Sequence, residues 1–102
     1  MQYNDMLIRV KIHERNTGMG YTKKSFRKTG DIYKVDKQPY SPELAKKQYG
    51  LSDENIKYRC FTEKQGLKAG DYVSCKSLFY LVLLAHDWDK HSELILGAFK
   101  NG

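Results

Sequence analysis

"GDYVSCKSLFYLVLLAHDW", residues 70–88, carries the strongest indication of the architecture. It holds two runs of aromatic and aliphatic residues, and the polar residues Lys76 and Ser77 lie between them. Strand-forming residues on both sides of a short polar break indicate a β-hairpin with a tight turn. The leucines also permit a helix over residues 78–99, but the turn signals before this segment and the aspartates of "HDWD" favour strands.

Segments on both sides of this hairpin predict further strands. The apolar residues of "MLIRVKIHE", residues 6–14, recur at every second position, which is typical of a strand with one buried face. That face is expected to consist of Met6, Ile8, Val10 and Ile12. Leu7 is the one apolar residue expected on the other face. Three more strands are predicted at residues 31–37, 55–61 and 92–100. In the last of them Gly97 is a candidate bulge.

One short helix is predicted within "QPYSPELAKKQYG", residues 38–50. The Ser41 hydroxyl suits the N-cap, Pro42 suits the first turn because its missing N–H would be unpaired there, and Gly50 suits the left-handed C-terminal position. Only about two turns lie between these signals, too few for a helix that is stable alone in water. Something outside the segment must hold it, or it is ordered only on assembly. The chain is therefore expected to be mainly β, a small antiparallel barrel or sandwich of six strands and one helix in a single domain over residues 1–102.

"RNTGMGYTKKSFRKTGD", residues 15–31, breaks the periodicity with its glycines and predicts a long loop over residues 15–30. It is also the basic part of a chain whose net charge is +6. Between Arg9 and Lys28 there are seven Lys and Arg residues and a single acid, Glu14. The local positive electrostatic field of these residues favours binding to phosphate or to an acidic protein surface. The alternative is that the loop is only solvated and has no partner.

Composition bounds the classes of function. With 102 residues the chain is a module rather than a multi-step enzyme. Its longest apolar run, residues 78–85, is far short of the roughly 20 residues that span a bilayer, and no leader pattern opens the chain, so a soluble intracellular protein is expected. Cys60 and Cys75 form no CxxC motif and are expected to be buried thiols. We expect no metal and no cofactor.

Two chemical hypotheses rest on local clusters. "HDWDKH", residues 86–91, would have to bring its histidines and aspartates together in a pocket for acid–base or metal chemistry, whereas a turn between strands explains the same residues without catalysis. No catalytic residue is therefore assigned. The loop interleaves aromatic and basic residues, a chemistry that binds nucleic acid, so a small basic nucleic-acid-binding barrel is an alternative function. That interaction loop comprises Arg15, Tyr21, Lys23, Lys24, Phe26, Arg27 and Lys28.

The order of features in the second half resembles a known family. A strand ending in "QPYS", a short polar helix, "NIKYRCF", a "GDYV" turn and strand, "FYLV" and a final aliphatic strand follow one another. This string, over about residues 5–99, is similar to the head-closure proteins of long-tailed bacteriophages, also called stopper, head–tail joining or minor capsid proteins. The sequence departs from the family pattern at Lys76 and Ser77, where a small or turn residue such as glycine is usual.

The resemblance implies a structural, non-enzymatic role in the virion. Its protomers would form a ring of six or twelve copies at the head–tail interface, between the portal or adaptor protein and a tail terminator or tail completion protein, without contact to a membrane. The protein would be made in the bacterial cytoplasm. The segment between residues 38 and 55 would project towards the channel, close it and hold packaged double-stranded DNA without sequence preference.

The same resemblance assigns residues to this gate. Lys46 and Lys47, with Lys37 as a third candidate, would face DNA phosphates. The full gate set is Gln38, Pro39, Ser41, Glu43, Lys46, Lys47, Gln48 and Tyr49. The loop 15–30 would be a mobile contact arm towards the adaptor ring or the tail.

Overall fold

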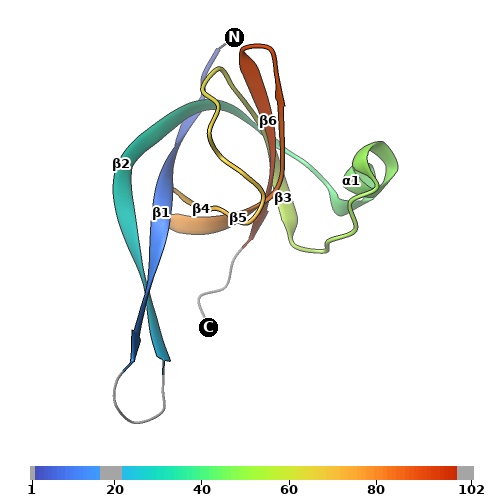
Figure 1. Ribbon diagram of the computed structural model, residues 1–102. Coiled ribbons are helices and arrows are strands. Elements are labelled where there is room, and N and C mark those ends of the chain that lie inside the picture. Colours follow the sequence, from blue (N-terminus) through green and yellow to red (C-terminus); the bar gives the residue numbers. More distant parts are fainter. Residues whose placement is uncertain (1, 17–21, 99–102) are drawn as a thin grey trace.

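The structure is a computed structural model, and it describes residues 2–16 and 22–98. Its six strands form a closed antiparallel barrel in the order β1-β2-β3-β6-β5-β4, with a single short helix outside it (Figure 1). The elements are β1 (Asp5–Asn16), β2 (Thr22–Pro39), α1 (Pro42–Tyr49), β3 (Ile56–Thr62), β4 (Tyr72–Cys75), β5 (Leu78–Trp88) and β6 (His91–Ala98). The predicted mainly-β class with six strands and one helix is confirmed, and of the two architectures it is the barrel that forms.

The predicted hairpin at residues 70–88 is confirmed as β4 and β5. Cys75 pairs with Leu78, so the loop consists of Lys76 and Ser77 alone. Both have positive φ angles, 49° and 70°, which is the backbone of the two-residue turn whose twist matches that of the strands. Although neither residue is glycine, the hairpin closes with a two-residue turn. The predicted strand over residues 55–61 corresponds to β3, and the closing strand corresponds to β6.

The barrel interior is filled by one cluster of buried side chains. Tyr33 is its largest member, and its hydroxyl donates a hydrogen bond to Asp31 at 3.0 Å. The other members are Leu7, Val35, Cys60, Leu67, Val73, Cys75, Tyr80, Val82, Leu94 and Leu96. On β6, residues 92–97 are all buried, because the strand faces the interior on one side and α1 with its neighbours on the other.

The first strand turns a different face inwards from the one expected. Leu7 is fully buried and pairs with Tyr33, whereas Met6 is 51% exposed, so the predicted buried face is wrong at this end. The reason is a register irregularity between Ile8 and Val10. Such an irregularity breaks the simple alternation on which a period-two prediction depends. Val10 beyond it is buried.

The predicted loop over residues 15–30 is also wrong, because most of it is strand. β1 and β2 pair from Val10 opposite Lys28 to Asn16 opposite Thr22, and together they extend beyond the barrel (Figure 1). Gly30 lies at the irregularity, not in a loop, and Thr29 Oγ1 donates to the Arg9 carbonyl at 2.9 Å there. Of the expected loop, residues 17–21 lie outside the described part. We call the paired segments 10–16 and 22–28 the arm.

Gly97 is not itself a bulge residue. The irregularities near it lie on its neighbours, between Ile56 and Tyr58 of β3 and between Val82 and Leu84 of β5. A Cβ atom at position 97 would come within 2.8 Å of the Leu83 side chain. A side chain at position 97 would therefore have to displace the end of the Leu83 side chain of β5.

Candidate functional site

The helix begins and ends where the sequence predicts. Ser41 Oγ accepts a hydrogen bond from the Leu44 N–H at 3.2 Å, and Pro42 occupies the first helical position. Gly50 has a φ of 67° and its N–H donates to the carbonyls at the end of the helix. All three local signals are thus confirmed, because each satisfies a backbone group that the helix leaves unpaired at its ends.

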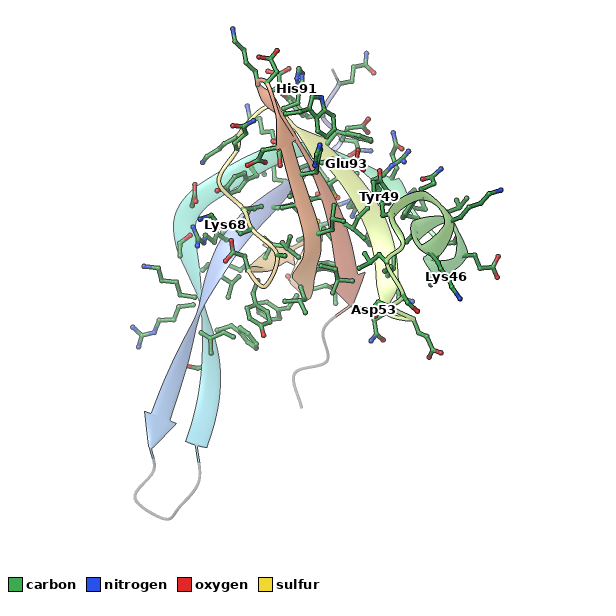
Figure 2. The ribbon with its side chains drawn as sticks, turned by 45° about the vertical axis from the view of Figure 1, so that its right-hand side comes forward. Lys46, Tyr49, Asp53, Lys68, His91 and Glu93 are labelled. Carbon is green, nitrogen blue, oxygen red and sulfur yellow. The ribbon has the colours of Figure 1, made fainter. Side chains whose placement is uncertain are left out.

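A small second core holds the helix on the outer face of the barrel. Ala45 is fully buried and packs in a cluster with Tyr40, Ile56 and Ile95. Tyr49 lies on the barrel side of α1, where its ring is 6.3 Å from that of Tyr40, and Lys46 lies on the side away from the barrel (Figure 2). The expectation that something outside the segment holds the helix is confirmed. Apolar partners on β3 and β6 supply what two turns lack.

Polar contacts among Tyr40, Gln48 and Arg59 join the helix to β3, and we call them the Gln48 latch. The Tyr40 hydroxyl donates to Gln48 Oε1, and the Arg59 guanidinium also approaches this oxygen, at 3.4 Å. The same guanidinium lies over the Tyr40 ring, 4.9 Å from its centroid, and over the Phe61 ring at 5.1 Å. Gln48, predicted as a residue of the channel gate, is therefore engaged with the barrel.

The other predicted gate residues fall into three groups. Gln38 and Pro39 end β2 and pair with Arg59 and Tyr58, so the hydrogen bonds between β2 and β3 hold them. Glu43, Lys46 and Lys47 are exposed on the helix, as is Gln48, and a DNA-facing role depends on these residues. Ser41 is the N-cap, and Tyr49 is half-buried against the barrel.

Lys37 does not face outwards as a DNA contact. Its Nζ forms an ion pair with Asp5 at 2.8 Å and lies over the Tyr58 ring, 4.4 Å from the centroid. Burial opposes the charged form of both groups, but the hydrogen bond between them prevails: the pKa of Lys37 is raised and that of Asp5 is lowered. The pair ties the start of β1 to the end of β2.

Two charged residues of β3 and β6 have polar atoms that find no hydrogen-bond partner among the described residues. They are Arg59 at Nε and Glu93 at Oε1. Glu93 is only 8% exposed, and burial raises the pKa of its carboxyl. It lies on β6 between Phe61 of β3 and His86 of β5 (Figure 2). Sequence reasoning missed both residues, although a lone acid inside the apolar run "SELILGA" was a signal.

Of the predicted interaction loop, the structure describes the side chains of Phe26, Arg27 and Lys28. Phe26 is half-buried, and its ring stacks on that of Phe79 at 4.9 Å and lies 5.8 Å from that of Tyr72. Arg27 and Lys28 are exposed. The backbone places Arg15 on β1, and Lys23 and Lys24 on β2, whereas Tyr21 lies outside the described residues. The aromatic part of the predicted site is thus engaged with the barrel.

The "HDWDKH" cluster is the tip of the β5–β6 hairpin. Trp88 pairs with His91, and Asp89 has a positive φ of 50°, so a turn explains these residues. The Asp87 carboxylate accepts a hydrogen bond from Ser92, and the His86 ring lies 5.2 Å from that of Trp88. In the described part of the chain, no group of three or more His, Cys, Asp and Glu residues is placed to hold a metal ion.

Two further features bear on function. Cys60 and Cys75 are buried free thiols, as predicted, and burial raises the pKa of Cys60 to about 12. On the outer face of β1 and β2, exposed Met6 and Ile32 line an apolar hollow of about 510 Å³. Tyr3, Lys34, Thr62, Glu63 and Lys64 complete its lining.

Comparison with known proteins adds no relative. No family model matches the sequence, and no curated protein matches it. Within residues 2–16 and 22–98, no helix has the length and apolar character needed to cross a membrane.

Proposed function

We propose that this chain is a structural protein of the bacteriophage neck. It forms a ring below the portal or adaptor, closes the channel to retain packaged DNA and provides the surface to which the tail attaches. The proposal is supported by the position of α1. This short helix, within the segment 38–55, lies outside an otherwise closed barrel. This is the architecture that the resemblance to head-closure proteins implies.

The proposal assigns the gate to the outer helix. Its exposed side carries Lys46 and Lys47, whose charges suit non-specific contact with DNA phosphates. Its other side is held by one buried residue, Ala45, the Tyr49 ring and the Gln48 latch. An element with so few buried contacts is the part of a domain that moves at least cost. The unpaired Nε of Arg59 lowers that cost further, because this side chain contacts Gln48 of the helix and water reaches it once the helix departs.

A ring also requires a lateral contact between copies. The apolar hollow at Met6 and Ile32 lies on β1 and β2, away from α1, so a neighbouring copy can cover it without covering the gate (Figure 1). A head-to-tail ring uses two different patches, because each copy presents one patch to each neighbour. In this proposal the hollow is one of the two lateral surfaces.

The proposal is tested by deleting the gene in its source phage or prophage. After induction we expect normal tails beside unjoined heads that have lost their DNA, counted by electron microscopy. Normal joined virions would contradict the proposal.

Complementation of the deletion with variant genes tests the gate. The double variant Lys46→Glu, Lys47→Glu should give joined or unjoined heads that leak DNA. The double variant Lys57→Glu, Lys90→Glu, with the same charge change at exposed positions elsewhere, should restore infectious particles.

A further inference from the structure

The arm is a two-stranded ribbon that stands apart from the barrel sheet. β1 pairs with β4 only from Ile8 to Val10, and β2 pairs with β3 only from Asp36 to Pro39. Within the described residues, the segments 11–16 and 22–28 therefore pair with each other alone. A ribbon of this kind has a fixed register, so the strand pairing determines which positions share a face.

The strand register places four Lys and Arg positions on one face of this ribbon. Partners opposite each other in an antiparallel ladder share a face, and Lys11 is opposite Arg27 while Arg15 is opposite Lys23. Lys11 and Arg27 are both exposed. We call this the cationic face, and its six positions are Lys11, His13, Arg15, Lys23, Ser25 and Arg27.

The opposite face attaches the ribbon to the barrel. Val10 is buried, and Phe26 stacks on Phe79 and contacts Tyr72. The hydrogen bond from Thr29 to the Arg9 carbonyl fixes the base of the ribbon. This face is apolar only at the base of the ribbon, at Val10, Ile12 and Phe26, and on the cationic face Lys11 and Arg27 are exposed and open to a partner.

The positive charges on this face favour binding of an anion. Like charges directly opposite each other destabilise a ribbon, and here two such pairs occur within seven residues of each strand. The chain carries 18 basic and 12 acidic residues, a net +6, and residues 11–28 hold six of the basic and one of the acidic residues, a net +5. Nearly all the net charge is thus in the arm, and the barrel is close to neutral.

The composition of the face distinguishes between anionic partners. Protein interfaces centre on an apolar core, and none of the six positions is apolar. Interfaces with nucleic acid are polar and strongly positive, and the major groove admits a two-stranded β-ribbon. We propose that the cationic face of the arm binds the phosphate backbone of duplex nucleic acid without sequence preference. This proposal depends neither on ring assembly nor on the gate.

The test is binding of the purified full chain to a labelled duplex of about 30 base pairs, measured by fluorescence anisotropy between about 50 and 200 mM salt, with two unrelated sequences. The arm variant is Lys11→Gln with Arg27→Gln. The matched control is Lys57→Gln with Lys90→Gln, which removes the same charge from exposed positions on the barrel. Thermal melting of both variants checks that the fold is kept.

We expect the wild type to bind both sequences equally, with an affinity that falls steeply with salt. The arm variant should bind about tenfold more weakly and should lower the salt slope by about two, and the control should change affinity less than about twofold. Absence of binding, or equal loss in both variants, would overturn the proposal. So would displacement of the duplex by polyglutamate of equal charge at equal concentration, because the face would then fit an acidic protein. None of these failures bears on the particle counts that test the neck assignment.

Discussion

The arm and the outer helix are the two parts of this chain that leave the barrel, and they are attached in different ways. The arm continues the hydrogen-bond ladder of β1 and β2 and is fastened by the Phe26 ring. The helix interrupts the path between β2 and β3 and depends on side chains, with Ala45 buried and Gln48 latched. Backbone hydrogen bonds between β1 and β2 hold the arm in an extended form without a core of its own. The helix is held by a small cluster of side chains, so it can separate from the barrel as a unit.

The largest effect should come from the core beneath the helix. Ile95 is fully buried there, and Ile95→Ala should lower the free energy of unfolding by about 3 kcal/mol, because it leaves a cavity between β6 and α1. Urea unfolding measures it. Ile12→Ala, at a half-buried arm position, is the matched control and should cost less than about 1 kcal/mol. Equal losses of unfolding free energy in the two variants would contradict the difference proposed between the attachment of the helix and that of the arm.

A smaller effect is expected where the arm meets the barrel. Phe26→Ala removes the ring contacts with Phe79 and Tyr72 and should cost about 1–2 kcal/mol. Hydrogen exchange should show faster exchange of amides in the arm, with those of Leu94 and Leu96 in the barrel less affected. If the arm amides kept their protection, the ladder alone would hold the arm.

The smallest effect is a dependence of stability on pH that originates at Glu93 of β6. The pKa of Glu93 is raised in the folded state by burial, so the folded state binds the proton more tightly than the unfolded chain does. Stability from this group is complete below the ordinary glutamate pKa and is lost as pH rises through the raised value. Asp5, whose pKa is lowered, acts in the opposite direction at lower pH.

Glu93→Gln isolates that contribution. The difference in unfolding free energy between wild type and Glu93→Gln should shift in favour of the variant as pH rises above the ordinary glutamate range, measured by denaturant unfolding at several pH values. Glu54→Gln, at an exposed position near the helix, is the control and should show a flat difference. A flat difference for Glu93→Gln as well would mean that its carboxyl is solvated in solution.

Local chemistry, readable from the sequence alone, determined much of this protein. The caps Ser41 and Gly50 placed the helix, because they act on backbone groups within a few residues. Alternation and the Lys76–Ser77 turn placed the hairpin and the mainly-β class for the same reason. The candidate gate and the basic character of the arm region were also visible as residue types, since charge does not depend on the fold.

Tertiary structure decided what depends on partners distant in sequence. The arm is strand because residues 10–16 find a ladder in 22–28, and its glycines suggested a loop only when read locally. Leu7 rather than Met6 is buried because a register irregularity resets the alternation. Phe26 contacts Phe79, and Glu93 is buried with no hydrogen-bond partner for its Oε1 among the described residues, through contacts that no local pattern encodes. Strand pairing and packing are non-local, and the sequence specifies them only through the complete fold.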